Sequence, residues 1–341
     1  MTLLLPERPC ADAPAQTLDS LTRRGILGTG IGAAAVLGLA ACGSDASPAD
    51  SSTAGSTRKL DSANGVVEVP AHPTRIVTID TYSMAAMFDL GMDPVGVYDA
   101  GEQYVEPQFL DRWKKIPKVS GGSVAGSIDV EKVAALSPDL IIGIDAMKPP
   151  YSQLKAIAPT VILSFSAAKA PWRDLAEATA DAINLPRPMK KLESEYAART
   201  AHIKTTYADV LAATRFDVIQ GGFDKGQFWL YGPGSPSHDI LADAGARFAS
   251  ASAGVKVQKP TSYEQIGKLS DADAIIYYAT NDGKPANLAP ALFAQPLWKR
   301  LPAVEKDALF GSIYFLPGCY SDALGLLDDF EKTLTKLGGR R

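Results

Sequence analysis

The stretch 130–142, VEKVAALSPDLII, returns in outline at residues 263–276, which read YEQIGKLSDADAII. Each copy spaces its apolar residues as in a short amphipathic helix and then, after a turn, runs into consecutive apolar residues typical of a buried strand. After one inserted residue in the second copy, Asp139 aligns with Asp273 immediately before that strand. The repetition predicts two half-chains of similar helix–turn–strand design.

The start of each predicted helix carries the same kinds of residue. Asp129 and Ser262 are good N-cap types, and Gln265 completes a capping-box spacing with Ser262. Glu131 and Glu264 occupy matching positions on the first helical turn, where a carboxylate also complements the helix dipole. The two glutamates are therefore expected at equivalent points of the two half-chains.

Short apolar strands alternate with helices between residues 75 and 185. The predicted strands are 75–80, 94–98, 140–144 and 160–165, and the predicted helices are 82–90, 130–136, 151–157 and 172–183. This alternation favours a mainly parallel sheet that is covered by helices on both faces.

A long uninterrupted segment then breaks the alternation. Residues 188–213 contain no internal Gly or Pro and place apolar residues at helical spacing, which predicts one helix of about 25 residues and roughly 38 Å. In the series that follows, the predicted strands are 216–221, 228–231, 274–278 and 308–315, and the predicted helices are 238–244, 263–269, 296–301 and 321–337. We therefore expect an α/β protein of two Rossmann-like lobes with mainly parallel sheets, joined by one long rigid α-helix.

The first forty residues have the layout of an export signal. Arg23 and Arg24 directly precede the uncharged apolar stretch 26–41, which is short for a membrane span. The paired arginines resemble a twin-arginine export signal, although an aliphatic residue replaces the usual aromatic, and the LAAC that ends at Cys42 resembles the lipobox of bacterial lipoproteins. We expect cleavage before Cys42 and lipid attachment to its thiol; a plain cleaved signal and an uncleaved anchor are the alternatives, and the general export route is the alternative to the twin-arginine route.

The segment after this cysteine is polar. GSDASPADSSTAGST is almost free of large apolar residues and is typical of a disordered tether. The expected divisions of the chain are a signal peptide at 1–41, the lipidated cysteine and disordered linker at 42–63, an N-terminal lobe at 64–186, an inter-lobe helix at 187–213 and a C-terminal lobe at 214–341.

Composition and motifs argue against several function classes. The chain has 341 residues, of which 46% are hydrophobic and 21% charged, and its formal net charge of −4 gives no basic surface for nucleic acid. The cysteines and histidines are too scattered for a metal site or a disulfide framework; they are Cys10, Cys42, Cys319, His72, His202 and His238. The sequence contains no phosphate-binding loop, zinc-protease motif or nucleophile elbow, so we predict no enzyme, no catalytic residue, no cofactor and no protein-bound metal.

Large side chains follow the predicted strands, at the carboxyl edge where ligands of open α/β sheets bind. In the N-terminal lobe the candidates are Tyr82, Tyr98, Met147, Tyr151 and Trp172, and in the C-terminal lobe they are Lys225, Trp229, Tyr278, Tyr314 and Phe315. Across a cleft between the lobes, such groups can hold a bulky and partly apolar ligand. For each of them, packing in a half-buried position is the alternative.

Residues 60 to about 338 resemble the solute-binding proteins of ATP-driven (ABC) importers of class III, which have one rigid inter-lobe helix. The resemblance rests on PTRIVTIDTYSMAAMFDLGMDPVGV, DVEKVAALSPDLIIG, QLKAIAPTV, LYGPGSPSHDILADAGA and PLWKRLPAVEKDALF, which occur in this order. It implies capture of a ferric siderophore, haem or cobalamin by a lipid-anchored monomer on the extracytoplasmic face of the cell membrane. It also implies a permease dimer and its ATPase as partners, with Glu131 and Glu264 docking the two lobes onto the permease.

The resemblance leaves the ligand type to be argued from this sequence. Relatives that bind catecholate complexes present several arginines, often in a Gly-Ser-Arg after the Tyr-Gly turn, but residues 234–237 read Gly-Ser-Pro-Ser here. Arg75 and Arg173 are not placed for a cluster either. A ferric tris-hydroxamate is neutral or weakly charged and apolar at its rim, so the aromatic set with Lys225 favours a hydroxamate siderophore, which holds the iron itself.

Two other ligands and two other function classes stay open. Haem could take Tyr82 or Tyr151 as an iron ligand, and cobalamin also suits an aromatic cleft. An enzyme on the same α/β scaffold would need a shifted acid–base pair in the cleft. A signalling or scaffold lipoprotein would instead need an apolar groove without buried polar anchors.

Overall fold

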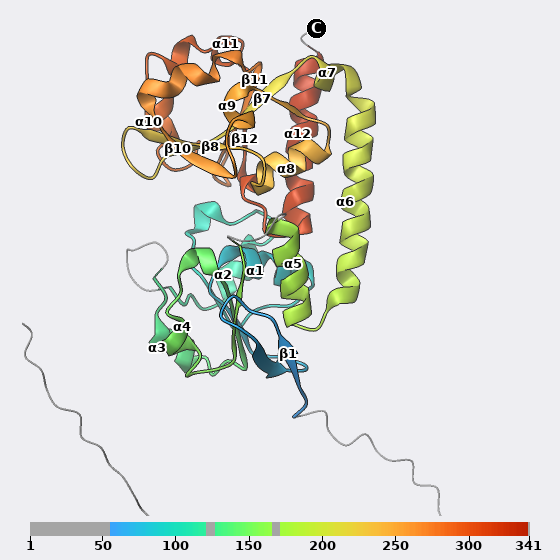
Figure 1. Ribbon diagram of the computed structural model, residues 1–341, viewed down its shortest axis with the longest axis vertical. Coiled ribbons are helices and arrows are strands. Elements are labelled where there is room, and N and C mark those ends of the chain that lie inside the picture. Colours follow the sequence, from blue (N-terminus) through green and yellow to red (C-terminus); the bar gives the residue numbers. More distant parts are fainter. Residues whose placement is uncertain (1–54, 121–126, 166–170, 340–341) are drawn as a thin grey trace, which may run out of the picture. The chain divides into compact units, whose positions relative to one another are not determined.

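The computed structural model of the protein describes residues 55–120, 127–165 and 171–339 (Figure 1). Arg23, Arg24 and Cys42 lie outside these ranges, so the signal peptide and the lipidation site stay predictions. Within the described residues, no helix combines the length and the apolar character needed to cross a bilayer.

The N-terminal half is built on a four-stranded sheet in the order β4 (Gly96–Val97), β3 (Ile76–Thr78), β5 (Leu140–Ile144) and β6 (Thr160–Leu163). Its strand pairs are all parallel, as the alternating pattern predicts. Every residue of β5 and β6 is buried, which matches their unbroken apolar sequences. The α-helices of this half are α1 (Thr81–Asp89), α2 (Leu110–Lys115), α3 (Val130–Ala135), α4 (Tyr151–Leu154) and α5 (Pro171–Ala182), with the 3₁₀ turns η1 (Glu102–Tyr104) and η2 (Asp145–Met147).

Ordered structure begins inside the segment expected to be a disordered linker, 42–63. β1 (Thr57–Leu60) pairs antiparallel with β2 (Val67–Pro70). Arg58 fastens this hairpin to the end of α5 by donating to the carbonyl of Ala182 at 2.7 Å and pairing with Asp181 at 3.2 Å. The two strands have only four residues each, so their apolar content is too low for a strand signal in the sequence.

The C-terminal half contains a mixed sheet in the order β10 (Gln258–Ser262), β8 (Gln227–Tyr231), β7 (Arg215–Gly221), β11 (Ala274–Tyr278) and β12 (Leu309–Ser312), with β9 (Arg247–Phe248) pairing with β7. The pairs of β7 with β11 and β9, and of β11 with β12, are parallel. The pairs of β8 with β7 and β10 are antiparallel. Three of these five strand pairs are parallel, so the sheet is mainly parallel, as expected. Its antiparallel part begins at β8, because the short turn between β7 and β8 can connect only antiparallel strands.

Short helices and one long helix cover this second sheet. They are α8 (Pro236–Asp243), α9 (Ser250–Ala253), η3 (Tyr263–Asp271), α10 (Ala289–Phe293), η4 (Trp298–Arg300), α11 (Pro302–Glu305), η5 (Ile313–Phe315) and α12 (Tyr320–Gly338). The second copy of the repeat forms a 3₁₀ helix, η3, and the predicted side-chain cap from Ser262 is absent there, whereas Asp129 caps α3 by accepting from the N–H of Lys132.

The aspartates of the two copies make equivalent contacts, which explains why this residue recurs. The Asp139 carboxylate accepts from the N–H of Arg75 at 2.9 Å, and that of Asp273 accepts from the N–H of Arg215 at 2.9 Å. In return, each aspartate donates its own N–H to the carbonyl of the same arginine, again at 2.9 Å in both copies. Each aspartate thus aligns the start of one strand with its parallel neighbour, β5 with β3 and β11 with β7.

The predicted long helix at 187–213 is one helix and a short extension. α6 spans Pro186–Thr206, and α7 (Ala208–Ala212) follows after Tyr207, whose φ of −111° and ψ of 24° leave the helical region. Figure 1 shows α6 running alongside α12, and the two helices are in contact. The Tyr207 hydroxyl lies 3.0 Å from that of Thr335 on α12, which fixes the point of the break.

Three aromatic rings join the helices of both halves. Trp172 of α5 lies 5.3 Å from Tyr196 of α6 and 5.0 Å from Tyr320 of α12, measured between ring centroids and in edge-to-face geometry. Arg173 extends over the Trp172 and Tyr196 rings and forms an ion pair with Asp243 of α8. The two sheets are separate, but their buried side chains merge through these helices into one apolar cluster.

Replacing Trp172 by Ala should lower the free energy of unfolding by about 3–5 kcal/mol, because it removes a buried indole and leaves a cavity between three helices. Urea unfolding followed by circular dichroism measures the loss. Phe223→Ala is the matched control: with 67% of Phe223 exposed, we expect a change within about 0.5 kcal/mol. A loss below about 1 kcal/mol for Trp172→Ala would show that these rings do not hold the halves together.

Candidate ligand-binding site

A cleft of about 470 Å³ opens between the carboxyl ends of the strands in the two halves. Its lining residues are Thr81, Tyr82, Tyr98, Ala100, Tyr104, Glu106, Ala146 and Met147 from the N-terminal half, and Gln220, Phe223, Tyr278, Asn287 and Leu316 from the C-terminal half. They follow or end β3, β4, β5, β7, β11 and β12. This is the edge at which open α/β sheets bind their ligands.

Residues 101–108, which we call the cross-lobe arm, reach from the N-terminal half to the C-terminal half. The arm starts at Gly101, whose φ of 87° favours glycine. Asn281 holds it by donating its backbone N–H to the carbonyl of Gln103 at 3.0 Å and its side-chain amide to the carbonyl of Glu102 at 2.9 Å. Backbone contacts of this kind fix the path of the arm whatever its side chains are.

Side chains hold the other end of the arm. The amide of Gln108 accepts from the hydroxyl of Tyr314 at 3.0 Å and donates to the carboxylate of Asp322 at 3.1 Å. Both partners belong to the C-terminal half. The arm is thus hydrogen-bonded to that half at both ends, on either side of its cleft-lining residues.

Polar groups of the arm and of the C-terminal half meet inside the cleft. The Tyr104 hydroxyl donates to the Oδ1 atom of Asn287 at 3.0 Å, and its ring stacks on that of Tyr278 with centroids 5.9 Å apart. The Nδ2 atom of Asn287 is buried and has no hydrogen-bond partner among the described residues. This amide is a donor available to an oxygen atom of a ligand.

The opposite wall depends on the first turn of α1. Asp80 caps this helix by accepting from the N–H and the hydroxyl of Ser83, both at 2.8 Å, and so directs Tyr82 into the cleft. Burial raises the pKa of Asp80 to about 6. Burial, and next the charge of Asp80, also raise the pKa of Tyr82. A side chain at position 318 would clash with Tyr82, since a Cβ atom on Gly318 would lie 2.7 Å from the Cα of Tyr82.

The deepest part of the site is acidic. Burial, followed by the charge of Asp322, raises the pKa of Glu106 well above its usual value. The carboxylate of Asp322 is itself buried and accepts from the N–H of Gly318 at 3.2 Å. Asp89 lies nearby and accepts from the N–H of Ser321 at 3.0 Å, and burial raises its pKa as well.

Four of the ten residues expected to bind ligand line the cleft, namely Tyr82, Tyr98, Met147 and Tyr278. The other six do not line it: Tyr151, Trp172, Lys225, Trp229, Tyr314 and Phe315. Trp172 belongs to the aromatic contact between the helices, with 1% of its surface exposed. Phe315 is fully buried behind the cleft, where it stacks on Tyr278 with centroids 5.6 Å apart.

The remaining predicted residues either pack behind the cleft walls or lie on the surface outside the cleft. Tyr314 holds the arm through Gln108, as described above, because η5 ends β12 earlier than expected and turns these side chains away. Tyr151 packs against the second apolar cluster of the N-terminal half, and Trp229 against the main one. Lys225 is exposed on the turn between β7 and β8, close in sequence to the cleft-lining Phe223.

Several cleft residues carry no predicted role. Tyr104 and Glu106 lie in the loop after the predicted strand 94–98, so the rule that singled out Tyr98 could have found them if it had covered the whole loop. Phe223 follows the predicted strand 216–221, so the same rule could have found it, whereas Gln220 and Asn287 gave no comparable signal. Their positions depend on the β7–β8 turn and on the loop before α10, which are set by tertiary contacts.

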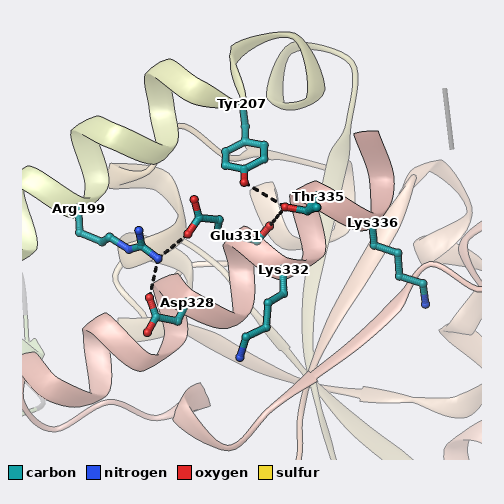
Figure 2. A pocket seen from close by; sticks show the side chains of 7 residues that line it. All are labelled: Arg199, Tyr207, Asp328, Glu331, Lys332, Thr335 and Lys336. Atoms are coloured by element: carbon teal, nitrogen blue, oxygen red, sulfur yellow. Dashed lines mark hydrogen bonds and ion pairs between the residues drawn. The ribbon is translucent and has the colours of Figure 1, made fainter. Parts of the chain in front are cut away.

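A second and larger groove of about 620 Å³ lies between α6 and α12 (Figure 2). Figure 2 shows Arg199 reaching to both Asp328 and Glu331, with a distance of 2.6 Å to the Asp328 carboxylate. Among the residues that the structure describes, Tyr207 is the only aromatic group that lines it. Because these charges already pair with one another, we favour the inter-lobe cleft as the ligand site.

Comparison with known proteins identifies the family of the chain. The model of the periplasmic binding protein family matches residues 91–312. The chain belongs to this family. A similar solved structure is that of the siderophore periplasmic binding protein from the fuscachelin gene cluster of Thermobifida fusca. It is 30% identical in sequence to this chain, and the match has a TM-score of 0.67 and covers 79% of this chain and 98% of the Thermobifida protein.

Two curated relatives of this binding protein come from Bacillus subtilis (strain 168). The one named "Probable siderophore-binding lipoprotein YfiY" is 29% identical over 320 residues, which cover 89% of this chain and 95% of the relative. The iron(3+)-hydroxamate-binding protein YxeB is 27% identical over 319 residues, covering 84% of this chain and 89% of the relative. Both names describe binding proteins, which supports the prediction that the chain is not an enzyme.

Burial of the Asp80 carboxyl, which caps α1, should make the stability of the binding protein depend on pH. The pKa of Asp80 is about 6 when folded and near 3.8 when unfolded, so the folded state binds the extra proton between these values. Stability relative to an Asp80→Asn variant, which keeps the cap, should fall as pH rises from about 4 to about 6, by roughly 3 kcal/mol at most.

Urea unfolding of both proteins between pH 4 and pH 8 measures this difference. A difference that stays level across the range, or that changes in the opposite direction, would contradict the assigned burial of the Asp80 carboxyl.

Proposed function

We propose that the protein captures a ferric siderophore of the hydroxamate type outside the cytoplasm and delivers it to the permease of an ABC importer. The observation that carries this proposal is the character of the cleft, which offers four tyrosines and a phenylalanine but no Lys, Arg or His among its described lining residues. A ferric tris-hydroxamate is uncharged at the metal centre and apolar at its rim. A triply anionic catecholate complex would need a cluster of cations in such a site.

Iron enters this scheme as cargo inside a preassembled chelate, without bonds to protein atoms. Haem is the less favoured alternative, because burial disfavours the ionised form of Tyr82 that would bind its iron, and Tyr151 lies outside the cleft. Cobalamin would contact the same aromatic side chains. Binding measurements with each ligand are therefore needed to distinguish cobalamin from a ferric hydroxamate.

Delivery requires attachment to the membrane and contact with a transporter. Cleavage before Cys42 and lipidation of its thiol would hold a monomer on the extracytoplasmic face. Glu131 and Glu264 are exposed, each is the second residue of its helix, and the two helices are the two copies of the sequence repeat. A permease dimer with its ATPase could engage both positions at once, with exposed charges that steer and register the encounter.

Ligand titration of the mature protein in detergent tests the binding function. We expect quenching of tryptophan fluorescence at micromolar or lower concentrations of a ferric tris-hydroxamate, and much weaker responses to a ferric catecholate, haem and cobalamin. Trp229, which packs beside the buried rings of the C-terminal half, supplies part of the signal. Absence of a response to all four ligands would refute the proposed function.

Charge reversal tests the docking role separately from binding. Glu131→Arg and Glu264→Arg should leave ligand affinity unchanged but lower the uptake of labelled iron by cells about tenfold or more, because the proposed docking pairs each glutamate with arginines of the permease, which an introduced arginine would repel. Glu177→Arg and Glu305→Arg are matched controls, since both glutamates are exposed and lie on α5 and α11 of the two halves. Equal uptake by the docking and control variants would contradict the docking role.

A further inference from the structure

Glu106 is the one charged side chain that lines the cleft among the described residues. It lies in the cross-lobe arm, two residues after Tyr104, and its side chain is half-buried. No ion pair reaches its carboxylate within the described part of the chain. A carboxylate that is withdrawn from water without a counterion is unfavourable, so its presence at the wall of a ligand cleft requires a reason.

The surroundings of Glu106 increase this cost. The titratable groups whose charge acts on it or responds to it are Asp322, Tyr82, Tyr278, Tyr314 and Cys319, and all of them are neutral or negative. The arm contains no Lys, Arg or His, and the bases that follow it pair elsewhere: Arg112 with Asp93 at 2.7 Å and Lys114 with the exposed Glu102 at 2.7 Å. The cleft wall therefore holds a carboxyl group for which the described residues supply no cationic partner.

We propose that Glu106 binds a cationic group of the ligand, so that the preferred cargo is a ferric tris-hydroxamate that carries a protonated primary amine. This inference rests on the proposed function and narrows its substrate class. Three singly charged hydroxamates neutralise Fe³⁺, and the ammonium group then gives the complex one net positive charge. Glu106 supplies the matching carboxylate by releasing its proton to the solvent when the ammonium group binds, and Asn287 lines the same cleft.

Such a site selects in two ways. A cationic complex gains an ion pair where water is partly excluded, which strengthens the attraction. An anionic complex, by contrast, meets Glu106, with the buried Asp322 behind it, and no compensating cation. Repulsion of the wrong ligand contributes to specificity as much as attraction of the right one.

Two ligands that differ only in charge test this inference. One is a linear ferric tris-hydroxamate that ends in a primary amine, and the other is the same compound with the amine acetylated. Titration calorimetry of the mature protein in detergent at pH 7.5 should show about tenfold or greater preference for the amine form. Glu106→Gln should remove the preference by weakening binding of the amine form alone, and Glu106→Asp should retain it.

Glu102→Gln is the matched control, because Glu102 belongs to the same arm but pairs with Lys114 outside the cleft. This variant should keep the wild-type preference. Equal affinity of the wild-type protein for the two compounds would overturn the inference without any variant, and so would an undiminished preference in Glu106→Gln. If neither compound binds the wild-type protein, the proposed function itself fails.

Discussion

The edge-to-face contact between Trp172, Tyr196 and Tyr320 is the constraint on which the rest of the arrangement depends. It joins a helix of each half to α6, so the two sheets keep a defined relation although no strand connects them. Aromatic pairs of this geometry add directional preference to ordinary burial. The carboxyl edges of both sheets are thereby held facing a common space, and the cleft follows from that relation.

Much of the fold could be predicted because its signals are local. β5 and β11 occupy the expected residues, Leu140–Ile144 and Ala274–Tyr278, since each is a continuous apolar run preceded by an aspartate that binds the neighbouring strand. The hairpin of β1 and β2 and the antiparallel β10 were not predicted. Their sequences are short and polar, and pairing with partners elsewhere in the chain stabilises them.

The candidate site was less predictable, because similar aromatic residues serve different roles. Tyr82 and Tyr278 line the cleft, whereas Trp172 and Phe315 are buried in contacts that support it. Position after a strand indicates the correct edge of the sheet but not the direction of a side chain. Glu106 illustrates the converse: nothing in its immediate sequence distinguishes it from the exposed Glu102, and only the path of the arm separates the two.

The cross-lobe arm belongs to one half of the protein by sequence and to the other half by its contacts. Its residues come from the first half, yet their hydrogen bonds run to Asn281, Tyr314 and Asp322 of the second. Any relative displacement of the halves that preserves these bonds carries Tyr104 and Glu106 along with Tyr278 and Asn287. The contacts that Tyr104 and Glu106 make with a guest molecule are then anchored to the C-terminal half, although the order of the chain assigns both residues to the first.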